Sequence, residues 1–317
     1  MKRYRIAILG GSGFVGSHLS AQLAKEGHTI TMLTRRRERC RHLFVLPSLT
    51  IVEADVHNPQ HLQRFLAHHD IVINLIGILN ERGDTGLGFH KTHVVLTEKI
   101  ITACRQHGIK RLLHMSALHA APDAPSHYLR SKGQAESFVM EQKDMQVTCF
   151  RPSVIFGPGD SFFNRFARLL RLTIGPFPLA CANARFAPIY VRDVVNAFVQ
   201  SIHRPETYGQ CYELCGPKIY RLIDLVTYTG QLVGRKRWIL PLGKFASALQ
   251  ANLLEYFPGK PFSRDNYRSM KIDSVCSKGW PDIFKTELST IESQVPEYLT
   301  HQRSRDRYMD IRQHSHR

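Results

Sequence analysis

The sequence lacks several features that define common classes of protein. Its longest uncharged apolar stretch, IVINLIGIL (71–79), is too short to span a bilayer. Its seventeen histidines show no HExxH or similar spacing, and its seven cysteines include no CxxC pair. We therefore expect no transmembrane segment and no metal site. The odd number of cysteines, mostly placed in apolar stretches, indicates free thiols in a reducing compartment.

Acidic residues are few relative to basic ones, 26 Asp and Glu against 43 Lys and Arg, which gives a formal net charge of +17. Both halves share the excess, with 19 basic against 12 acidic residues in 1–150 and 24 against 14 in 151–317. A diffuse positive field favours phosphate-bearing ligands, anionic membrane surfaces or acidic proteins, without choosing among them. No recognised nucleic-acid module accompanies it, so we expect no nucleic-acid partner.

The N-terminus, MKRYRIAILGGSGFVG, begins like a secretory signal, with basic residues before an apolar run. That run is only four residues long before the glycines begin, so a structural strand is the better interpretation. We expect a cytoplasmic protein, and a peripheral position at the inner membrane surface stays open.

Short β-branched runs alternate with longer amphipathic segments over the first half of the chain. Strands are predicted at 5–9, 29–33, 49–53, 71–77, 111–116 and 147–151. Helices are predicted at 14–26, 59–69, 92–107 and 128–142. Unalternating apolar strands separated by helices are typical of a parallel sheet covered on both faces, so the pattern predicts a doubly wound α/β fold, the Rossmann fold.

The pattern changes after about residue 152, where glycine, proline and aromatic residues become frequent and only 211–216 reads as a further strand. We predict a dinucleotide-binding Rossmann domain over 1–152. A smaller, irregular C-terminal substrate or partner lobe is predicted over 153–300, with some segments returning to the sheet. Residues 301–317 form a polar tail.

A glycine-rich turn, GGSGFVG, directly follows the first predicted strand and opens the first predicted helix. One glycine permits the tight turn, one lets backbone N–H groups reach a pyrophosphate, and one allows close packing of helix on strand. The position between strand and helix predicts dinucleotide binding. The residues expected to contact the cofactor here are Gly10, Ser12, Gly13, Phe14, Val15 and Gly16.

Five arginines lie within seven residues of TRRRERCRH (34–42), directly after the second predicted strand. This strand end normally carries an acid that binds the ribose hydroxyls of the adenosine, and none is in reach here. A carboxylate would repel a 2′-phosphate, whereas a guanidinium binds one. We therefore expect Thr34, Arg35 and Arg36 to bind the cofactor and NADP(H) to be preferred over NAD(H). The later arginines, Arg37, Arg39 and Arg41, are better interpreted as the solvated start of a helix.

Two further strand ends are expected to contact the cofactor. Asp55 and Val56 follow the third strand, where they fit either the adenine ring or, for Asp55, the cap of the helix near residue 59. Residues Leu75, Ile76 and Gly77 end the fourth strand, where they would lie along the sugars and phosphates.

The segment YLRSK places Tyr128 and Lys132 one helical turn apart on the same face. A lysine ammonium near a phenol favours the phenolate, so the tyrosine can exchange a proton with a carbonyl or an alcohol. The lysine can also hold the nicotinamide ribose, so both residues are expected to bind the cofactor as well. Ser116, at the end of the fifth predicted strand, completes the candidate catalytic set.

Together GGSGFVG, NLIG, SAL, YLRSK and RPSVIFGPGD resemble the short-chain dehydrogenase/reductase superfamily, in its extended and atypical branch. The longer segments 74–83, 128–136, 151–167 and 188–198 are similar to bacterial relatives of the NADPH-binding accessory subunit of respiratory complex I, alpha subcomplex subunit 9. The resemblance implies NADP(H) binding and adds Pro152 and Val154 to the cofactor contacts. It also implies a catalytic serine at Ser116, but the asparagine of the superfamily's fourth helix is missing, and Thr92 and His93 stand near that point.

Two functions follow from these observations. The first is an oxidoreductase acting on a carbonyl, an alcohol or a hydrophobic, quinone-related small molecule. The second, implied by the resemblance, is a non-catalytic protein that holds NADPH as an assembly or accessory subunit of a membrane redox complex.

The second lobe carries apolar stripes of less certain meaning. Phe245, Leu249, Leu253 and Phe257 recur at four-residue spacing, which favours a core face over a wall for a prenyl-type substrate or a face for a membrane-bound partner. The same choice holds for Phe162, Phe163 and Phe166. Asp193 is interpreted as a helix cap.

Overall fold

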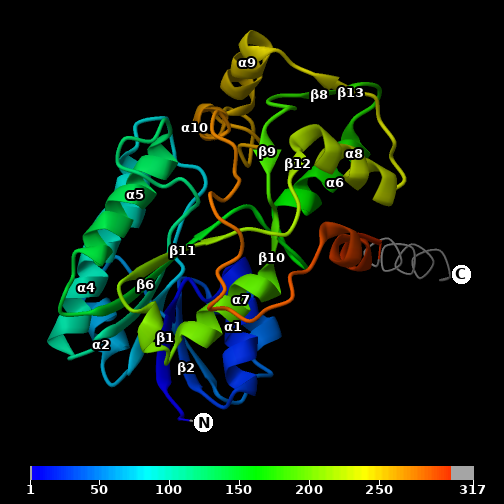
Figure 1. Cartoon of the computed structure of the whole chain (residues 1–317). Coiled ribbons are helices and arrows are strands. Elements are labelled where there is room, and N and C mark those ends of the chain that lie inside the picture. The colour runs from blue at the N-terminus through cyan, green and yellow to red at the C-terminus, as the bar shows by residue number, and fades with distance from the viewer. Residues whose placement is uncertain (1, 301–317) are drawn as a thin grey trace, which may run out of the picture. The chain divides into compact units, whose positions relative to one another are not determined.

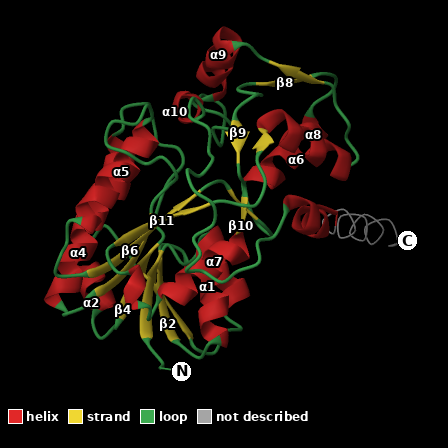
Figure 2. Cartoon of the chain, viewed as in Figure 1, coloured by secondary structure: helices red, strands yellow, loops and turns green. Residues whose placement is uncertain are grey.

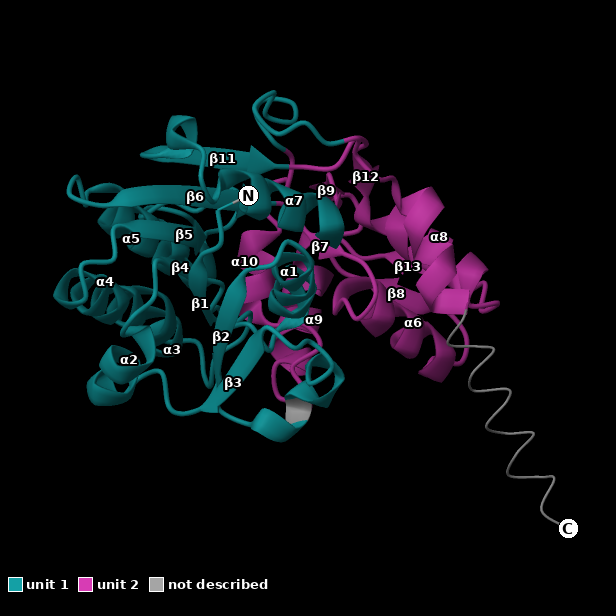
Figure 3. Cartoon of the chain, turned by 90° about the horizontal axis from the view of Figure 1, so that it is seen from below, with its two compact units in different colours: residues 1–152, 191–214, 276–286 teal, residues 153–190, 215–275, 287–317 magenta. Residues whose placement is uncertain are grey.

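The computed structural model describes residues 2–300, which divide into two compact units (Figure 3). The first unit contains the residues up to 152 together with 191–214 and 276–286. The second contains 153–190, 215–275 and the residues from 287 onward. The predicted tail, 301–317, lies outside the described residues.

The first unit is built on a seven-stranded sheet of order β11-β6-β5-β4-β1-β2-β3, in which all neighbouring strands are parallel. This confirms the predicted doubly wound α/β fold. The chain runs outward from β1 to β3 and then returns to the other side of β1, so the strand order reverses between β1 and β4. The strands are β1 (Arg5–Leu9), β2 (Thr29–Thr34), β3 (Leu49–Glu53), β4 (Ile71–Asn74), β5 (Arg111–Met115), β6 (Gln146–Pro152) and β11 (Gln210–Leu214).

Helices cover both faces of this sheet (Figure 1): α2, α4 and α5 pack together on one face, and α1 packs with α7 on the other. Helix α2 begins where predicted because Asn58 accepts hydrogen bonds from the N–H groups of Gln60 and His61 and is followed by a proline. The helical elements are α1 (Phe14–Lys25), the 3₁₀ helix η1 (Arg37–Leu43), α2 (Pro59–Leu66), α3 (Leu87–Phe89), the π-helix η2 (His90–Val95), α4 (Leu96–Gln106), α5 (His127–Met140), α7 (Val191–Ser201) and the 3₁₀ helix η3 (Pro205–Thr207).

The core of the first unit lies on both sides of the central strands. Four consecutive residues of β1, from Ile6 to Leu9, are fully buried, as an unalternating apolar strand requires. On the α7 face, Phe150 of β6 packs against Phe198 with ring centroids 4.1 Å apart. Asp193 lies buried in the first turn of α7.

The second unit consists of short strands and helices (Figure 2). Its strands form three two-stranded sheets, β10-β7, β12-β9 and β13-β8. None of these strands was predicted from the sequence, because two or three residues are too few to show a hydrophobic period. The strands are β7 (Ile155–Phe156), β8 (Phe177–Leu179), β9 (Arg185–Phe186), β10 (Ile189–Tyr190), β12 (Tyr220–Arg221) and β13 (Ile239–Pro241). The helices are α6 (Phe162–Leu172), α8 (Leu222–Leu232), α9 (Lys244–Leu254) and α10 (Arg264–Ser269).

The two apolar stripes of the second unit differ in burial. Phe163 is fully buried and meets Phe156 and Phe162 edge to face, so the core interpretation is right for the stripe on α6. The core interpretation is wrong for the stripe on α9, because Phe245, Leu249 and their neighbours in that stripe are exposed.

The expectation of seven free thiols is also wrong. Cys215 and Cys276 are disulfide-bonded, whereas Cys40, Cys104, Cys149, Cys181 and Cys211 are free. Because disulfides are typical of oxidising compartments, the cysteines no longer indicate a reducing one.

Candidate functional site

The glycine-rich turn lies between β1 and α1, at the carboxyl end of the sheet where the strand order reverses. Gly10 has a φ of +82°, and a Cβ there would lie 2.9 Å from the carbonyl carbon of Leu75. A Cβ on Gly16 would lie 2.5 Å from the carbonyl oxygen of Gly10. The N–H of Gly13 donates to that same oxygen at 3.0 Å and closes the turn. Only glycine therefore fits positions 10 and 16 without moving the backbone.

Helix α1 begins without a capping side chain, because Gly13 occupies the cap position. Its first turn contains no acidic residue, and it begins with Phe14, which is half-buried, and Val15, which is buried in the core. The first N–H groups of a helix carry a partial positive charge and need an acceptor. This helix end can therefore accept a phosphate group.

The end of β2 lies against the glycine turn. The hydroxyl of Thr34 donates to Oγ of Ser12 at 3.3 Å and accepts a hydrogen bond from the N–H of Arg36 at 3.3 Å. Arg35 and Arg36 are exposed, and neither is ion-paired with another residue of the described chain. Two exposed arginines thus directly follow the strand end that lies against the glycine turn.

An acid does lie within reach of this strand end, contrary to expectation. Glu53 is the Cα partner of Thr34 across the β2–β3 pair, and its carboxylate accepts a hydrogen bond of 2.8 Å from the N–H of Arg37. The end of β2 itself carries no acid, but the register of the β2–β3 pair places the end of β3 beside it.

The later arginines behave as surface residues of η1. Arg41 is paired with Glu38 one turn away, and the guanidinium of Arg37 lies over the ring of Phe44 at 5.3 Å. The side chain of Arg39 lies outside the described part of the chain. The interpretation of Arg37 and Arg41 as a solvated helix start is confirmed.

Of the two cofactor contacts predicted after β3, Asp55 is accessible and Val56 is not. Asp55 is exposed, and its carboxylate accepts a hydrogen bond of 3.0 Å from the N–H of His57. It does not cap α2, because Asn58 does, so that alternative is wrong. Val56 is buried in the core of the first unit, which leaves little of its side chain for an adenine ring.

The loop after β4 is fixed by hydrogen bonds on both sides. The N–H of Leu75 donates to the carbonyl of Leu9 at 2.9 Å, and the N–H of Ile76 donates to Oδ1 of Asn74 at 3.1 Å. The predicted strand over 71–77 is thus too long, since β4 ends at residue 74 and residues 75–77 belong to the loop. A Cβ on Gly77 would lie 3.1 Å from Nζ of Lys132, so this glycine allows the lysine to approach the loop.

Lys132 joins this loop to the end of β5. Its Nζ donates to the carbonyls of Met115 at 3.0 Å and Ile76 at 3.3 Å. Burial lowers the pKa of Lys132 to about 8, although Cys149 and Glu136 oppose this change. The ammonium is thus mostly protonated at pH 7 but can release its proton in the physiological range.

Tyr128 lies one turn before Lys132 on α5, at the edge of a small cluster of buried alanines. Its half-buried ring meets the rings of Phe89 and His93 edge to face, with centroids 6.0 and 5.7 Å away. These two contacts fix the ring of Tyr128, and the residue stays partly exposed to solvent.

Ser116 follows β5, and its N–H donates to the carbonyl of Phe150 at 2.8 Å. Its Oγ is buried and has no hydrogen-bond partner among the described residues, and the same holds for Nε2 of His114. Buried polar atoms normally have partners, so these two atoms indicate a place for a water or a ligand. Burial, with Lys132 nearby, lowers the pKa of His114 to about 3, so its ring is neutral.

His93, in the π-helix η2, connects the same elements. Its Nε2 accepts a hydrogen bond of 3.1 Å from the N–H of Ile78, so the proton of the neutral ring is on Nδ1. That proton is donated to Oγ of Ser131 at 2.8 Å, and the serine hydroxyl donates to the carbonyl of Tyr128 at 2.9 Å. Burial, with Lys132 and His114 nearby, lowers the pKa of His93 to about 2. In the sequence, His93 is distinguished only by its place near the missing asparagine.

The two remaining predicted contacts lie at the end of β6. The carbonyl of Pro152 accepts a hydrogen bond of 3.1 Å from the N–H of Leu118, which places Pro152 beside the segment after Ser116. Val154 belongs to the second unit, where its carbonyl accepts from the N–H of Ile189 at 2.9 Å.

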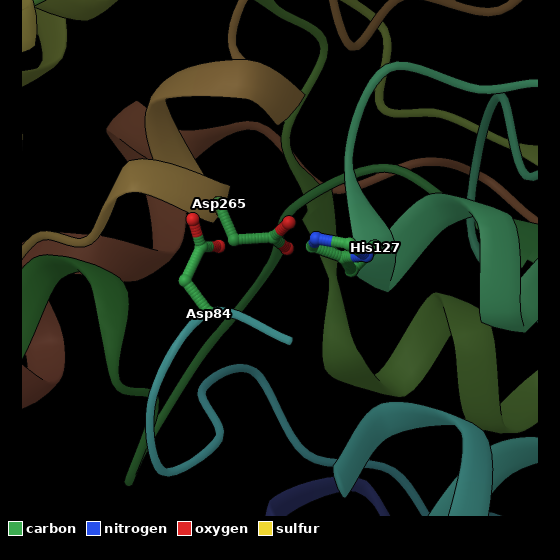
Figure 4. A group of neighbouring side chains, drawn as sticks. All are labelled: Asp84, His127 and Asp265. Carbon is green, nitrogen blue, oxygen red and sulfur yellow. The ribbon is translucent and has the colours of Figure 1, made fainter. Parts of the chain in front are cut away.

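Three other side chains offer metal-ligating atoms, Asp84, His127 and Asp265 (Figure 4). His127, in the first unit, already receives a hydrogen bond of 2.9 Å on Nδ1 from the guanidinium of Arg130. Asp265, in the second unit, lies 3.8 Å from the guanidinium of Arg268. Since these two side chains have cationic partners within their own units, we assign no metal to them.

The parallel sheet, the reversal of strand order and the glycine turn define a Rossmann protein built to bind a dinucleotide. The chain belongs to the NAD dependent epimerase/dehydratase family, whose model matches residues 6–215. This confirms the resemblance to the extended short-chain dehydrogenases/reductases and nicotinamide dinucleotides as the cofactor class of the family.

Relatives with known names include a complex I subunit and a reductase. The chain is 27% identical over 281 residues to the mouse mitochondrial NADH dehydrogenase [ubiquinone] 1 alpha subcomplex subunit 9, covering 87% of this chain and 74% of that protein. It is 28% identical over 201 residues to the ceramide reductase of Caulobacter vibrioides, covering 63% of this chain and 61% of the relative. Among solved structures, a UDP-N-acetylglucosamine 4-epimerase from Methanobrevibacter ruminantium M1 has a TM-score of 0.73 at 18% identity, over 96% of this chain and 100% of that one. At that identity the last likeness shows the fold alone.

The described helices include none that is long and apolar enough to cross a membrane.

Proposed function

We propose that this chain is an NADP(H)-dependent oxidoreductase that acts on a carbonyl, an alcohol or a hydrophobic, quinone-related molecule. The observation that carries the proposal is the pair formed by Tyr128 and Lys132. The two side chains lie one turn apart on α5, and the lysine is buried with a pKa near 8. A protonated ammonium close to a phenol favours the phenolate, which is the form that a proton-transferring tyrosine must reach.

In the reducing direction, Tyr128 donates its phenolic proton to the carbonyl oxygen of the substrate. When bound, a nicotinamide cofactor would supply the hydride for the carbonyl carbon. The carbonyl π bond breaks, one C–H and one O–H bond form, and the phenolate left behind regains a proton from solvent. Ser116 orients the substrate oxygen with its buried, unpartnered hydroxyl.

Arg35 and Arg36 support a preference for NADP(H). They are exposed beside Ser12 and Thr34, at the strand end where an adenosine ribose binds in a dinucleotide fold. A hydrogen bond to a charged group contributes about 1.5–3 kcal/mol, which corresponds to roughly a tenfold or greater change in affinity. Glu53 acts against this preference, since a carboxylate near the pocket repels a 2′-phosphate.

The cofactor preference is tested by fluorescence titration with NADPH and NADH. Changing Arg35 and Arg36 together to Ala should lower the preference for NADPH by about tenfold or more, and Glu53→Gln should raise it. Arg41→Ala, at an arginine that is paired with Glu38, is the matched control. An unchanged preference in the double variant would remove both arginines from the pocket.

Catalysis is tested by Tyr128→Phe on a panel of quinones and carbonyl compounds. We expect turnover to fall by about 10²-fold or more while the affinity for NADPH stays near that of the wild type. Tyr4→Phe, at the opposite end of the strands, is the control. Full activity of Tyr128→Phe would exclude this tyrosine as the acid.

A second function, an accessory or assembly subunit that holds NADPH without turning it over, is favoured by the similarity to the mouse complex I subunit. In that case the nucleotide stabilises the fold by being bound. Bound NADPH would then stay reduced in the presence of the whole panel, and the tagged chain would co-purify with subunits of a membrane redox complex. Oxidation of NADPH by one of the compounds would support the oxidoreductase and contradict the non-catalytic subunit.

A further inference from the structure

Helix α9, in the second unit (Figure 1), exposes the large apolar side chains that an amphipathic helix normally buries. It buries the small residues Ser247 and Ala251 and exposes the large apolar ones. Phe245 is 85% exposed, Leu249 is 50% exposed and Leu253 is 59% exposed. A helix that served only to complete a core would show the opposite pattern.

The exposed side chains form one continuous surface. At about 100° per residue, Phe245, Leu249 and Leu253 fall within roughly 80° of arc, on the side of the helix opposite Ser247 and Ala251. The chain adds two aromatic residues directly after the helix, Tyr256 and Phe257, which are 84% and 59% exposed. These five side chains are called the α9 apolar face.

Polar bonds hold α9 in this orientation. The amide of Gln250 donates to the carbonyl of Pro178 at 3.0 Å and accepts from the N–H of Ala180 at 3.1 Å. The hydroxyl of Ser247 accepts from the N–H of Cys181 at 3.3 Å and donates to the carbonyl of Leu242 at 3.2 Å. Rotating the helix to bury its apolar side chains would break all four hydrogen bonds, so the exposure is built into the fold.

The charged residues of α9 and of the segment directly after it, 244–260, are Lys244, Glu255 and Lys260. That acid is buried and bonded to Arg264 at 2.6 Å and to Lys260 at 3.6 Å. Lys244, at the first turn of α9, is exposed. This segment therefore carries an exposed cation, Lys244, and no exposed carboxylate.

We propose that the α9 apolar face docks on the surface of an anionic lipid bilayer. A helix with large apolar side chains, aromatic residues and flanking cations lies in the membrane interface, and anionic lipids strengthen its binding. A second copy of the chain fits less well, because it would bring another Lys244 and another net charge of +17 to the contact. The proposal goes beyond the proposed function, since it requires neither the nucleotide nor Tyr128.

The test is co-sedimentation of the full chain with vesicles of phosphatidylcholine, with and without phosphatidylglycerol. We expect binding to the anionic vesicles that weakens with added salt. The triple variant Phe245→Ser, Leu249→Ser, Leu253→Ser should lose about tenfold or more of its partitioning. Val45→Ser, at a side chain of the first unit that is 80% exposed, should leave binding unchanged.

The proposal would be overturned if the wild type failed to bind anionic vesicles, or if the triple variant bound them as well as the wild type does. It would also be overturned if sedimentation velocity showed that the triple substitution abolishes self-association and leaves lipid binding intact. Binding to a detergent-extracted membrane protein without binding to pure lipid would likewise assign the face to a protein partner. Circular dichroism of the triple variant controls for folding. NADPH titration is run in parallel, so vesicle binding without nucleotide binding would contradict the proposed function alone.

Discussion

Nδ1 of His93 lies 2.8 Å from Oγ of Ser131, and this hydrogen bond ties the π-helix η2 to helix α5. The other ring nitrogen of His93 holds the loop after β4 through the N–H of Ile78. One neutral imidazole thus connects the loop after β4 with the helix that carries Tyr128 and Lys132. The asparagine of the superfamily's fourth helix is missing from this chain, and the buried His93 lies near that point.

Replacing His93 with Leu should leave the N–H of Ile78 without its acceptor, while the hydroxyl of Ser131 keeps its hydrogen bond to the carbonyl of Tyr128. A polar group left without a partner costs about 1–3 kcal/mol, so we expect the free energy of unfolding to fall by about that amount. Urea unfolding followed by circular dichroism measures the change. His90→Leu, at an exposed position of the same π-helix, is the control and should be nearly neutral.

Lys132 should make stability depend on pH in the alkaline range. The unfolded chain keeps this proton up to pH 10.5, the ordinary value, whereas the folded chain loses it near pH 8. Between these values the unfolded state binds more protons, so the free energy of unfolding rises with pH by up to about 1.4 kcal/mol per unit.

Substitution of Lys132 by Met should remove this dependence. The stability of the wild type relative to Lys132→Met should therefore rise by about 2–3 kcal/mol between pH 8 and pH 10. Denaturant titrations of the nucleotide-free protein at several pH values measure the difference. Lys143→Met, at an exposed lysine, should keep the slope of the wild type. Parallel curves for Lys132→Met and the wild type would show that the lysine is not desolvated.

Ser116→Ala should lower turnover while changing the free energy of unfolding very little. Its Oγ is buried without a partner, so losing it should change the free energy of unfolding by no more than about 1 kcal/mol, in either direction. Turnover should nevertheless fall if the hydroxyl orients the substrate. Ser20→Ala removes another buried, unpartnered hydroxyl, on α1 away from the strand ends, and should leave turnover unchanged. Equal turnover in both variants would remove Ser116 from the catalytic set.

Gly16→Ala should weaken both folding and nucleotide binding. The added methyl would lie 2.5 Å from the carbonyl of Gly10, so the glycine turn must move. We expect a loss of about 3 kcal/mol in the free energy of unfolding and a weaker affinity for NADPH. Gly243→Ala, where a Cβ meets nothing within 4 Å, is the control for both measurements.

Much of the first unit was predictable because its signals are local. Buried parallel strands such as β1 are continuous apolar runs, and the glycine spacing after β1 follows from the turn and the close packing that it must make. Asn58, a capping residue followed by proline, marks the start of α2. Thr34 and the arginines after it were correctly placed at the end of β2.

Other features depend on neighbours that are distant in sequence. Glu53 lies beside Thr34 only because of the register between β2 and β3. His93 has its partners at Ile78 and Ser131, 15 and 38 residues away, so no local pattern distinguishes it from the other histidines. The π-helix around it also begins earlier than the predicted helix over 92–107.

The sequence by itself determined the doubly wound sheet, the glycine turn and the spacing of Tyr128 and Lys132, because periodicity and steric demand act over a few residues. The tertiary structure alone decided which face of α9 is buried. A stripe at four-residue spacing shows that a helix has an apolar side. That side is turned outward because Ser247 accepts a hydrogen bond from the N–H of Cys181 and Gln250 donates one to the carbonyl of Pro178. The same holds for the pKa of Lys132, which is set by burial that only the assembled sheet and helix provide.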